Sequence, residues 1–134
     1  MEEIRVLLVE SGEKPRLVTM EHTLENLQKT VGGHIQAIYP DPSDPIAIIC
    51  DDEGKFKGYP VNRMLLDDEG EPYDFIAGNF FICGLSAENF ASISDEMADK
   101  YTERFYWPEM LLRTLEGHVM WIRLKPGEEP KLIV

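Results

Sequence analysis

Arg63 and its neighbour Asn62 are the side chains of this sequence best suited to contact a small ligand. A guanidinium offers a planar fork of donors that matches a phosphate or a carboxylate group. The same arginine could instead pair with a nearby acid such as Asp67 or Asp74 and hold its own loop in place. The sequence leaves both interpretations open. In the first Arg63 contacts a ligand, and in the second its contact is purely structural.

Asn79 and Tyr59 are the other two candidates for ligand contact. Asn79 is the one polar side chain in the apolar run 75–84. A buried amide usually satisfies backbone groups, although it can also line a pocket. Tyr59 stands in the short segment 58–63, which also carries the arginine. The predicted ligand-binding set is therefore Tyr59, Asn62, Arg63 and Asn79.

Patterns typical of catalysis are missing from the sequence. It has no G-x-S-x-G elbow, no P-loop and no dinucleotide-binding glycine pattern. Cys50 and Cys83 each close an apolar run, which predicts buried, reduced thiols rather than a disulfide. A zinc site would have to combine them with His34 and His118, but no two of these ligands have the close spacing that such sites use. A catalytic carboxylate pair stays open, because nothing in the spacing selects two of the 25 acids.

The tetrapeptide Asp-Asp-Glu-Gly occurs twice, at 51–54 and at 67–70. An EF-hand calcium loop needs alternating acids, a glycine at the sixth place and a glutamate at the twelfth, and neither copy has that spacing. Acids followed by glycine are typical of turns, so both copies are predicted to be hairpin tips. We therefore predict no catalytic residue, no metal and no cofactor, and we favour a protein that is not an enzyme.

The charge of the chain restricts its partners. With 25 acids and 13 bases the net charge is −12, which argues against binding to a nucleic-acid phosphate backbone. A charged partner should be basic, and the acids could then imitate DNA phosphates and occupy a nucleic-acid-binding protein. Alternatively, the acids only keep a small protein in solution. No apolar run is long enough to span a membrane, and Met1-Glu2-Glu3 does not resemble a secretory signal, so we expect a cytoplasmic location.

The elements that must position these residues can be inferred from apolar patterns and capping residues. An N-terminal hairpin is predicted from 4–9 and 17–20, followed by a helix that Thr23 begins and the pair Gly32-Gly33 ends. The run Ile46–Cys50 is apolar throughout, which suggests a central strand covered on both faces. A second helix is predicted from Ser94, or from the nearby Ser92, to Phe105, with Met97, Tyr101 and Phe105 on its buried side.

The last part of the chain is predicted to hold a short helical piece at 109–115 and a closing hairpin formed by 118–124 and 131–134. At 134 residues the chain should form one domain, residues 1–134. Because hairpin signals outnumber long crossovers, we predict an α+β fold. It should have a mainly antiparallel sheet of about five to seven strands with two principal helices on one face.

Several segments together resemble a known bacterial and phage family, the domain of unknown function 3846. They are the strand Val6–Val9, the helix end Val31-Gly32-Gly33, the segment Gly58–Arg63, the strand Ile76–Gly84 and the helix Ser94–Phe105. The resemblance covers about residues 4–107. It implies an accessory cytoplasmic role in bacteria, phages or mobile elements, and it supplies no catalytic residues. Residues 108–134 depart from the family's short form.

Two functional hypotheses follow. The first is a non-enzymatic binding module associated with a phage or mobile element, which occupies a basic host protein such as a nucleic-acid-binding or defence protein. The second is a small pocket protein that binds or processes a phosphorylated or nucleotide-like ligand near Asn62, Arg63 and Asn79. The oligomeric state is left open by the sequence.

Overall fold

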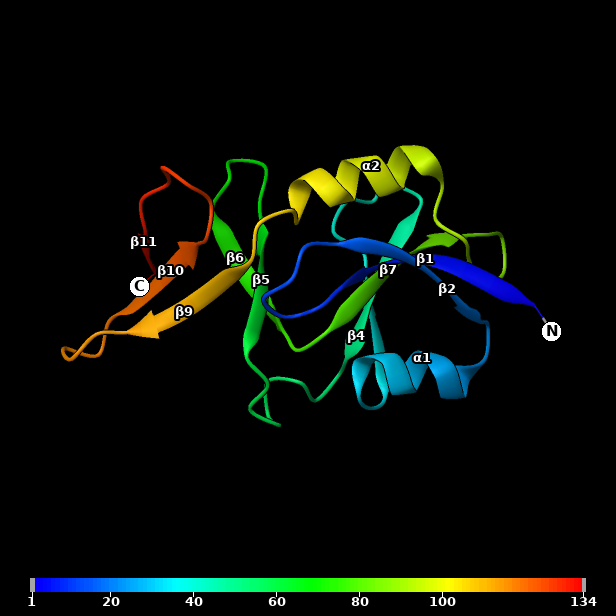
Figure 1. The fold of residues 1–134 in the computed structure, drawn as a ribbon, viewed down its shortest axis with the longest axis horizontal. Coiled ribbons are helices and arrows are strands. Elements are labelled where there is room, and N and C mark those ends of the chain that lie inside the picture. The colour runs from blue at the N-terminus through cyan, green and yellow to red at the C-terminus, as the bar shows by residue number, and fades with distance from the viewer. Residues whose placement is uncertain (1, 134) are drawn as a thin grey trace.

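The computed structural model describes residues 2–133, which form two helices and eleven strands (Figure 1). The helices are α1 (Leu24–Val31) and α2 (Asp95–Arg104). The strands of the first half are β1 (Glu3–Val9), β2 (Arg16–Glu21), β3 (Ile35–Ile38), β4 (Ile46–Asp51) and β5 (Val61–Leu66). Those of the second half are β6 (Pro72–Ala77), β7 (Phe80–Leu85), β8 (Phe90–Ala91), β9 (Glu109–Arg113), β10 (Val119–Arg123) and β11 (Lys131–Ile133).

A six-stranded sheet forms the centre of the molecule. Its strands run in the order β2-β1-β7-β4-β3, and β8 adds to β7. Every pairing within it is antiparallel. The predicted N-terminal hairpin is present, because β1 pairs with β2 from Glu3 opposite Glu21 to Leu8 opposite Arg16. The α+β class and the mainly antiparallel sheet are therefore confirmed.

The two helices cover opposite faces of this sheet, so the expectation that both lie on one face is wrong (Figure 1). Leu27 and Val31 of α1 pack with one set of strand residues, which includes Val6. Met97 and Tyr101 of α2 belong to the other cluster of buried residues. Successive side chains of a strand alternate between the two faces, so the apolar central strands supply both clusters.

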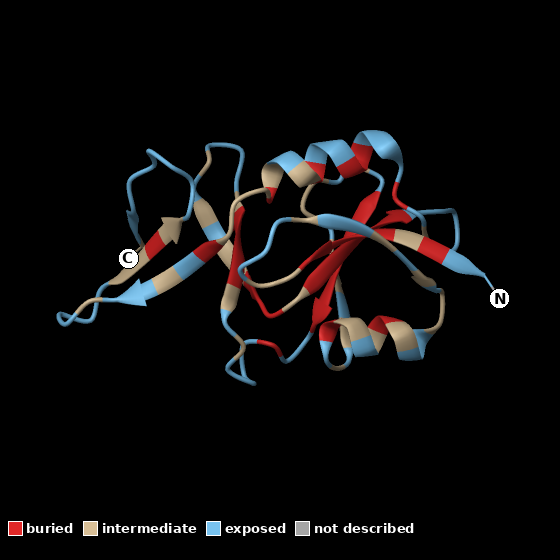
Figure 2. Ribbon diagram, in the orientation of Figure 1, coloured by how far each residue is buried: buried red, intermediate tan, exposed pale blue. Residues whose placement is uncertain are grey.

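Burial is concentrated in these central strands (Figure 2). All six residues of β4 are buried, and five of the six in β7 are buried. A strand with apolar side chains on both faces is stable only where both faces are covered. The sequence-based prediction of a central strand at Ile46–Cys50 is confirmed, and the same apolar pattern accounts for a helix on each side.

Both helix boundaries agree with the capping residues in the sequence. The side chain of Thr23 accepts a hydrogen bond from the backbone N–H of Asn26, and Gly32 ends α1 with a left-handed φ of 98°. Ser94 caps α2 by accepting from the N–H of Met97. The alternative cap, Ser92, instead accepts from the backbone N–H of Arg5 in β1.

The two Asp-Asp-Glu-Gly segments differ in structure. Residues 67–70 form the turn of the β5–β6 hairpin, where Gly70 has a φ of 81°. That prediction is confirmed. Residues 51–54 were also predicted to be a hairpin tip, and this is wrong, because the strands before and after them do not pair with each other. The preceding strand β4 pairs with β3 and β7, whereas the following strand β5 belongs to a separate two-stranded sheet with β6. In this loop Gly58, rather than Gly54, takes a positive φ.

The C-terminal part is a separate three-stranded antiparallel sheet in the order β11-β10-β9. The closing hairpin is confirmed by the pairing of β10 with β11, from Val119 opposite Ile133 to Trp121 opposite Lys131. The helical piece predicted at 109–115 is wrong, since Glu109–Arg113 is strand β9 and pairs with β10. Within residues 2–133, neither helix has the length and apolar character needed to cross a bilayer.

Candidate functional site

Arg63 lies inside the molecule, on β5, with none of its surface exposed. Its Nε donates a hydrogen bond of 2.9 Å to the carbonyl of Phe105, at the end of α2. Its Nη2 donates to the carbonyl of Glu13, in the loop between β1 and β2, at 2.5 Å. The guanidinium thus joins three segments that are far apart in the chain. It has no exposed surface with which to meet a ligand.

Asn62 acts together with this arginine. Its side-chain oxygen and its backbone carbonyl both accept from Nη1 of Arg63, at 2.7 and 3.0 Å. Its amide nitrogen donates to the carbonyls of Val9 and Gly78, each at 2.9 Å. Asn62 therefore satisfies buried backbone carbonyls of β1 and of the β6–β7 connection, and it is itself fully buried.

The charge of Arg63 is held without an adjacent carboxylate. Burial lowers the pKa of its guanidinium to about 10, and the carboxylate of Glu109 acts in the opposite direction. The group is therefore still protonated at neutral pH. The local acids named from the sequence have other partners: Asp74 pairs with Lys55 at 2.5 Å, and Asp67 accepts from backbone N–H groups of its own turn.

Tyr59 and Asn79 come together at the surface instead. Both line a pocket of about 360 Å³ beside the end of α1, to which Ser11 and Lys29 also contribute. The side-chain oxygen of Asn79 accepts from the backbone N–H of Ser11 at 3.0 Å. The hydroxyl of Ser11 is buried and has no hydrogen-bond partner within residues 2–133. Of the predicted set, then, the structure groups Tyr59 with Asn79 and separates them from Arg63.

The ring of Tyr59 occupies space that side chains at two glycines of this pocket would fill. A side-chain carbon added at Gly32 would lie 2.8 Å from the hydroxyl of Tyr59, and one added at Gly78 would lie 2.5 Å from its ring. Both glycines have a positive φ as well, 98° and 84°. Only glycine meets both requirements at these positions. These two glycines therefore leave the space in which the ring of Tyr59 forms part of the pocket wall.

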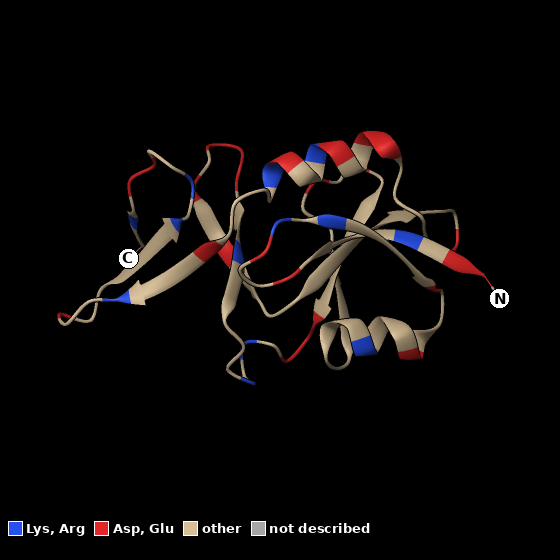
Figure 3. Ribbon diagram, in the orientation of Figure 1, with Lys and Arg blue, Asp and Glu red and all other residues tan. Residues whose placement is uncertain are grey.

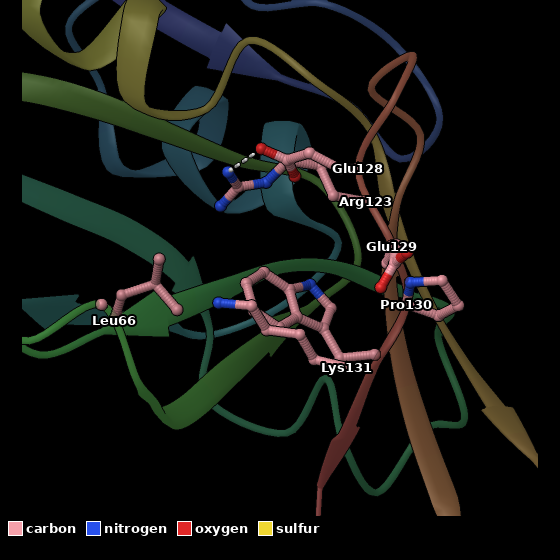
Figure 4. A pocket seen from close by; sticks show the side chains of 8 residues that line it. Leu66, Arg123, Glu128, Glu129, Pro130 and Lys131 are labelled. Carbon is pink, nitrogen blue, oxygen red and sulfur yellow. Dashed lines mark ion pairs between the residues drawn. The ribbon is translucent and has the colours of Figure 1, made fainter.

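A second pocket, of about 500 Å³, lies between the β5–β6 hairpin and the C-terminal sheet (Figure 4). Arg123 and Lys131 lie over the ring of Trp121, with 5.2 and 5.3 Å to its centroid. The indole N–H of Trp121 is buried and unpaired among the described residues. Figure 4 shows Arg123 beside Glu128, to which it is joined by an ion pair of 3.6 Å. The charges lining this pocket are mixed, because Glu128 and Glu129 line it together with Arg123 and Lys131.

The cysteines are not arranged for catalysis. Both are free thiols. Burial raises the pKa of Cys50 to about 11 and that of Cys83 to about 12. A nucleophilic cysteine needs a lowered pKa, because the thiolate is the reactive form. In the part of the chain from 2 to 133, no three side chains of His, Cys, Asp or Glu gather as they would around a metal ion.

Exposed acids gather on one side of the molecule, along α2 and at the β5–β6 turn (Figure 3). The guanidinium of Arg104 joins the two elements by donating to the carbonyl of Leu66 at 3.1 Å. Seven acids of this side form no ion pair with any described residue. They are Asp67, Asp68, Glu69, Glu71, Glu96, Asp99 and Glu103, which we call the acidic face.

Ser11 and Lys29 were not predicted as pocket residues from the sequence. Along the chain, Ser11 lies at least 48 residues from Tyr59 and Asn79, and Lys29 lies at least 30 residues from them. Only the hairpin and α1 bring them together. The position of the acidic face was partly visible in advance, because Glu96, Asp99 and Glu103 follow helical spacing opposite the buried stripe of α2.

Comparison with known proteins identifies a family and nothing more specific. No curated protein and no solved structure gives a significant match to the chain. The model of a family described as a domain of unknown function matches residues 4–106. This agrees with the resemblance seen in the sequence, which covered about residues 4–107. Because the match spans most of the chain, the protein belongs to the family of domain of unknown function 3846 (DUF3846).

Proposed function

We propose that this protein is a non-enzymatic binding module that uses its acidic face to occupy a basic partner protein. The observation that carries the proposal is the gathering of seven exposed, unpaired acids at α2 and the β5–β6 turn. Charges of one sign that lack local partners attract a surface of the opposite sign and speed its approach.

The shape of the acidic face also supports a partner that normally binds nucleic acid. Glu96, Asp99 and Glu103 lie along one side of α2 and span about 10 Å of helix. A row of negative charges on a rigid support can take the place of a phosphate backbone on a basic surface. The buried stripe of α2, which includes Tyr101, fixes the helix on the sheet and leaves the acids facing outward.

The proposed partner is a host nucleic-acid-binding or defence protein, and the module acts in the cytoplasm on behalf of a phage or mobile element. This role is supported by the family resemblance, which implies an accessory function, and by the acidic composition of the chain. The buried thiols and the fully engaged Arg63 favour binding over catalysis.

Binding through the acidic face should depend strongly on salt. We expect proteins captured from a bacterial lysate at about 50 mM salt to be released at about 500 mM, because screening shortens the range of exposed charges. The triple variant Glu96→Gln, Asp99→Asn and Glu103→Gln should bind the same protein about ten-fold more weakly. Three contacts worth about 0.5 kcal/mol each account for such a loss.

A matched control separates the acidic face from net charge. Glu21, Glu25 and Glu53 are exposed acids at or near the α1 side of the sheet and form no ion pair with a described residue. Changing all three to glutamine removes the same number of negative charges as the triple variant. This control should bind like the original protein. Equal weakening in both triple variants would show that the charge of the whole molecule, and not the acidic face, governs binding.

A second candidate function is the binding of a phosphorylated ligand in the pocket of Tyr59 and Asn79. The observation in its favour is that Lys29, whose ammonium makes no ion pair with the described residues, lines the pocket together with the hydroxyl-bearing Tyr59 and with Asn79. Hydroxyl and ammonium donors are suited to phosphate oxygens. Arg63, which the sequence offered for this role, is replaced in it by Lys29.

Thermal shift measurements test this second candidate. At ten times its dissociation constant, a nucleoside monophosphate should raise the melting temperature by about 4 °C. Lys29→Met should abolish the shift and leave the melting temperature of the free protein unchanged, because Lys29 is exposed. Lys125→Met, an exposed lysine in the turn after β10, is the control and should keep the full shift. A shift that survives in Lys29→Met would exclude the pocket as the binding site.

A further inference from the structure

The C-terminal sheet presents one face made entirely of apolar side chains. Residues paired directly across antiparallel strands share a face. Met110 lies opposite Ile122, and Met120 lies between Leu112 on one side and Leu132 on the other. The five residues belong to three neighbouring strands. We call this set, Met110, Leu112, Met120, Ile122 and Leu132, the outer face of the sheet.

The opposite face of the same sheet is the one that meets the rest of the protein. Trp121 lies on it, opposite Leu111, and is buried. At the edge, Glu109 accepts a hydrogen bond of 2.7 Å from the backbone N–H of Met64 in β5. These contacts fix the orientation of the sheet and leave its outer face pointing away from the molecule.

The outer face is open to solvent. Met110, Leu112 and Leu132 are 40%, 46% and 53% exposed. Met120 and Ile122, on the central strand, are partly exposed, and none of the five residues belongs to either buried cluster. Two further exposed leucines lie near its ends, Leu115 in the β9–β10 turn and Leu124 just after β10. A contiguous apolar face of this kind on a small protein marks a surface that associates.

The charge distribution indicates what associates with it. Residues 108–134 carry four acids and four bases, so the C-terminal sheet is neutral, while the other 21 acids and nine bases carry the whole net charge of −12. The sheet lies at one end of the long axis of the molecule (Figure 1). Two copies that meet there bring together the ends of the molecule that carry no net charge, rather than the parts that carry the whole charge of −12.

We infer that the outer face of the C-terminal sheet is the interface of a homodimer. The two copies meet face to face through the same residues, as two-fold symmetry requires. A foreign acidic partner has no cationic patch to recognise on this face, and a foreign basic partner is drawn to the acidic face instead. A second copy matches the outer face in both its apolar character and its lack of net charge. Methionine side chains at its centre adapt readily to such packing.

The dimer should be weak. The outer face and its two flanking leucines provide far fewer residues than the roughly 20–30 on each side of a standard interface. We therefore expect a dissociation constant in the micromolar range or above. Raising the salt concentration should strengthen the dimer, because it screens the repulsion between two acidic chains. Binding through the acidic face should respond in the opposite sense, so the two proposals can fail independently.

Sedimentation equilibrium over a range of concentrations tests the inference. The apparent mass of the original protein should rise from 15.4 kDa toward twice that value. Leu112→Lys places a charge on the outer face, on the edge strand β9, and should weaken the dimer at least about ten-fold. Leu132→Lys, on the opposite edge strand β11, should do the same. Both residues are about half exposed, so far-UV circular dichroism should show the original fold in each variant.

Leu24→Lys is the matched control, because Leu24 is an exposed leucine on α1, away from the C-terminal sheet. All three variants lower the net negative charge by one, which by itself favours association. Leu24→Lys should therefore dimerise at least as well as the original protein. The inference is overturned if the original protein keeps a mass of 15.4 kDa up to about 1 mM, a concentration at which even a very weak complex is half formed. It is equally overturned if Leu112→Lys dimerises like Leu24→Lys.

Discussion

Replacing Arg63 with methionine is expected to lower the free energy of unfolding by about 3 kcal/mol or more. The change removes the donors that serve the carbonyls of Phe105 and Glu13 and the side-chain oxygen of Asn62. A buried acceptor left without a donor costs about 1–3 kcal/mol. Methionine does avoid the cost of burying a cation, and this offsets part of the loss. An exposed ion pair with Asp67 or Asp74, the structural alternative suggested by the sequence, would cost no more than about 1 kcal/mol.

Urea denaturation of Arg63→Met and of Arg16→Met measures this difference. Arg16 is exposed and pairs with Glu10 at 3.0 Å, so the same chemical change there should cost less than about 1 kcal/mol. Arg63→Lys is informative as well. Lysine keeps the charge, but a single ammonium cannot reproduce donors directed at three separate segments, so most of the loss should remain. Equal stabilities of Arg63→Met and Arg16→Met would contradict the structural role of Arg63.

Truncating Phe105 to alanine should cost about 3–5 kcal/mol. Its ring is 2% exposed and meets the ring of Phe80 edge to face, with 5.4 Å between centroids. It also stacks with Tyr101 of α2 at 6.2 Å. Deleting the ring therefore opens a cavity where α2 joins the sheet. The midpoint of urea denaturation should fall accordingly.

Phe56→Ala provides the control for this truncation. Phe56 is 91% exposed in the loop between β4 and β5, so removing its ring should leave the midpoint within about 0.5 kcal/mol of the original. A small effect at Phe105 would mean that the stripe of Met97, Tyr101 and Phe105 does not form part of the core. The stripe was predicted from helical spacing in the sequence, and the structure places all three residues among the buried ones.

Local signals in the sequence predicted the helices well, because each helix is bounded by residues that act on their immediate neighbours. Thr23 and Ser94 bind N–H groups three residues ahead, and Gly32 closes α1 through its own backbone. The segment 109–113 lacks such signals. Its glutamate, methionine, leucines and arginine favour a helix by propensity, but pairing with β10 overrides that preference.

The candidate site was harder to predict, since its contacts join distant parts of the chain. The partners of Arg63 are carbonyls at Glu13 and Phe105, and every residue carries a carbonyl, so no residue type marks these two. The opposite placement of the helices, by contrast, could have been predicted. The strand Ile46–Cys50 is apolar on both faces, which already required a cover on each.

The position of β1 in the central sheet has a consequence for folding during protein synthesis. β1 and β2 can pair as soon as they leave the ribosome, but the other neighbour of β1 is β7, whose residues 80–85 are made much later. At about 5–20 residues per second, the roughly 70 residues between them take about 4–14 s to translate. During that interval one edge of an apolar strand has no partner, so the nascent chain passes through a period in which it is open to aggregation or to chaperones.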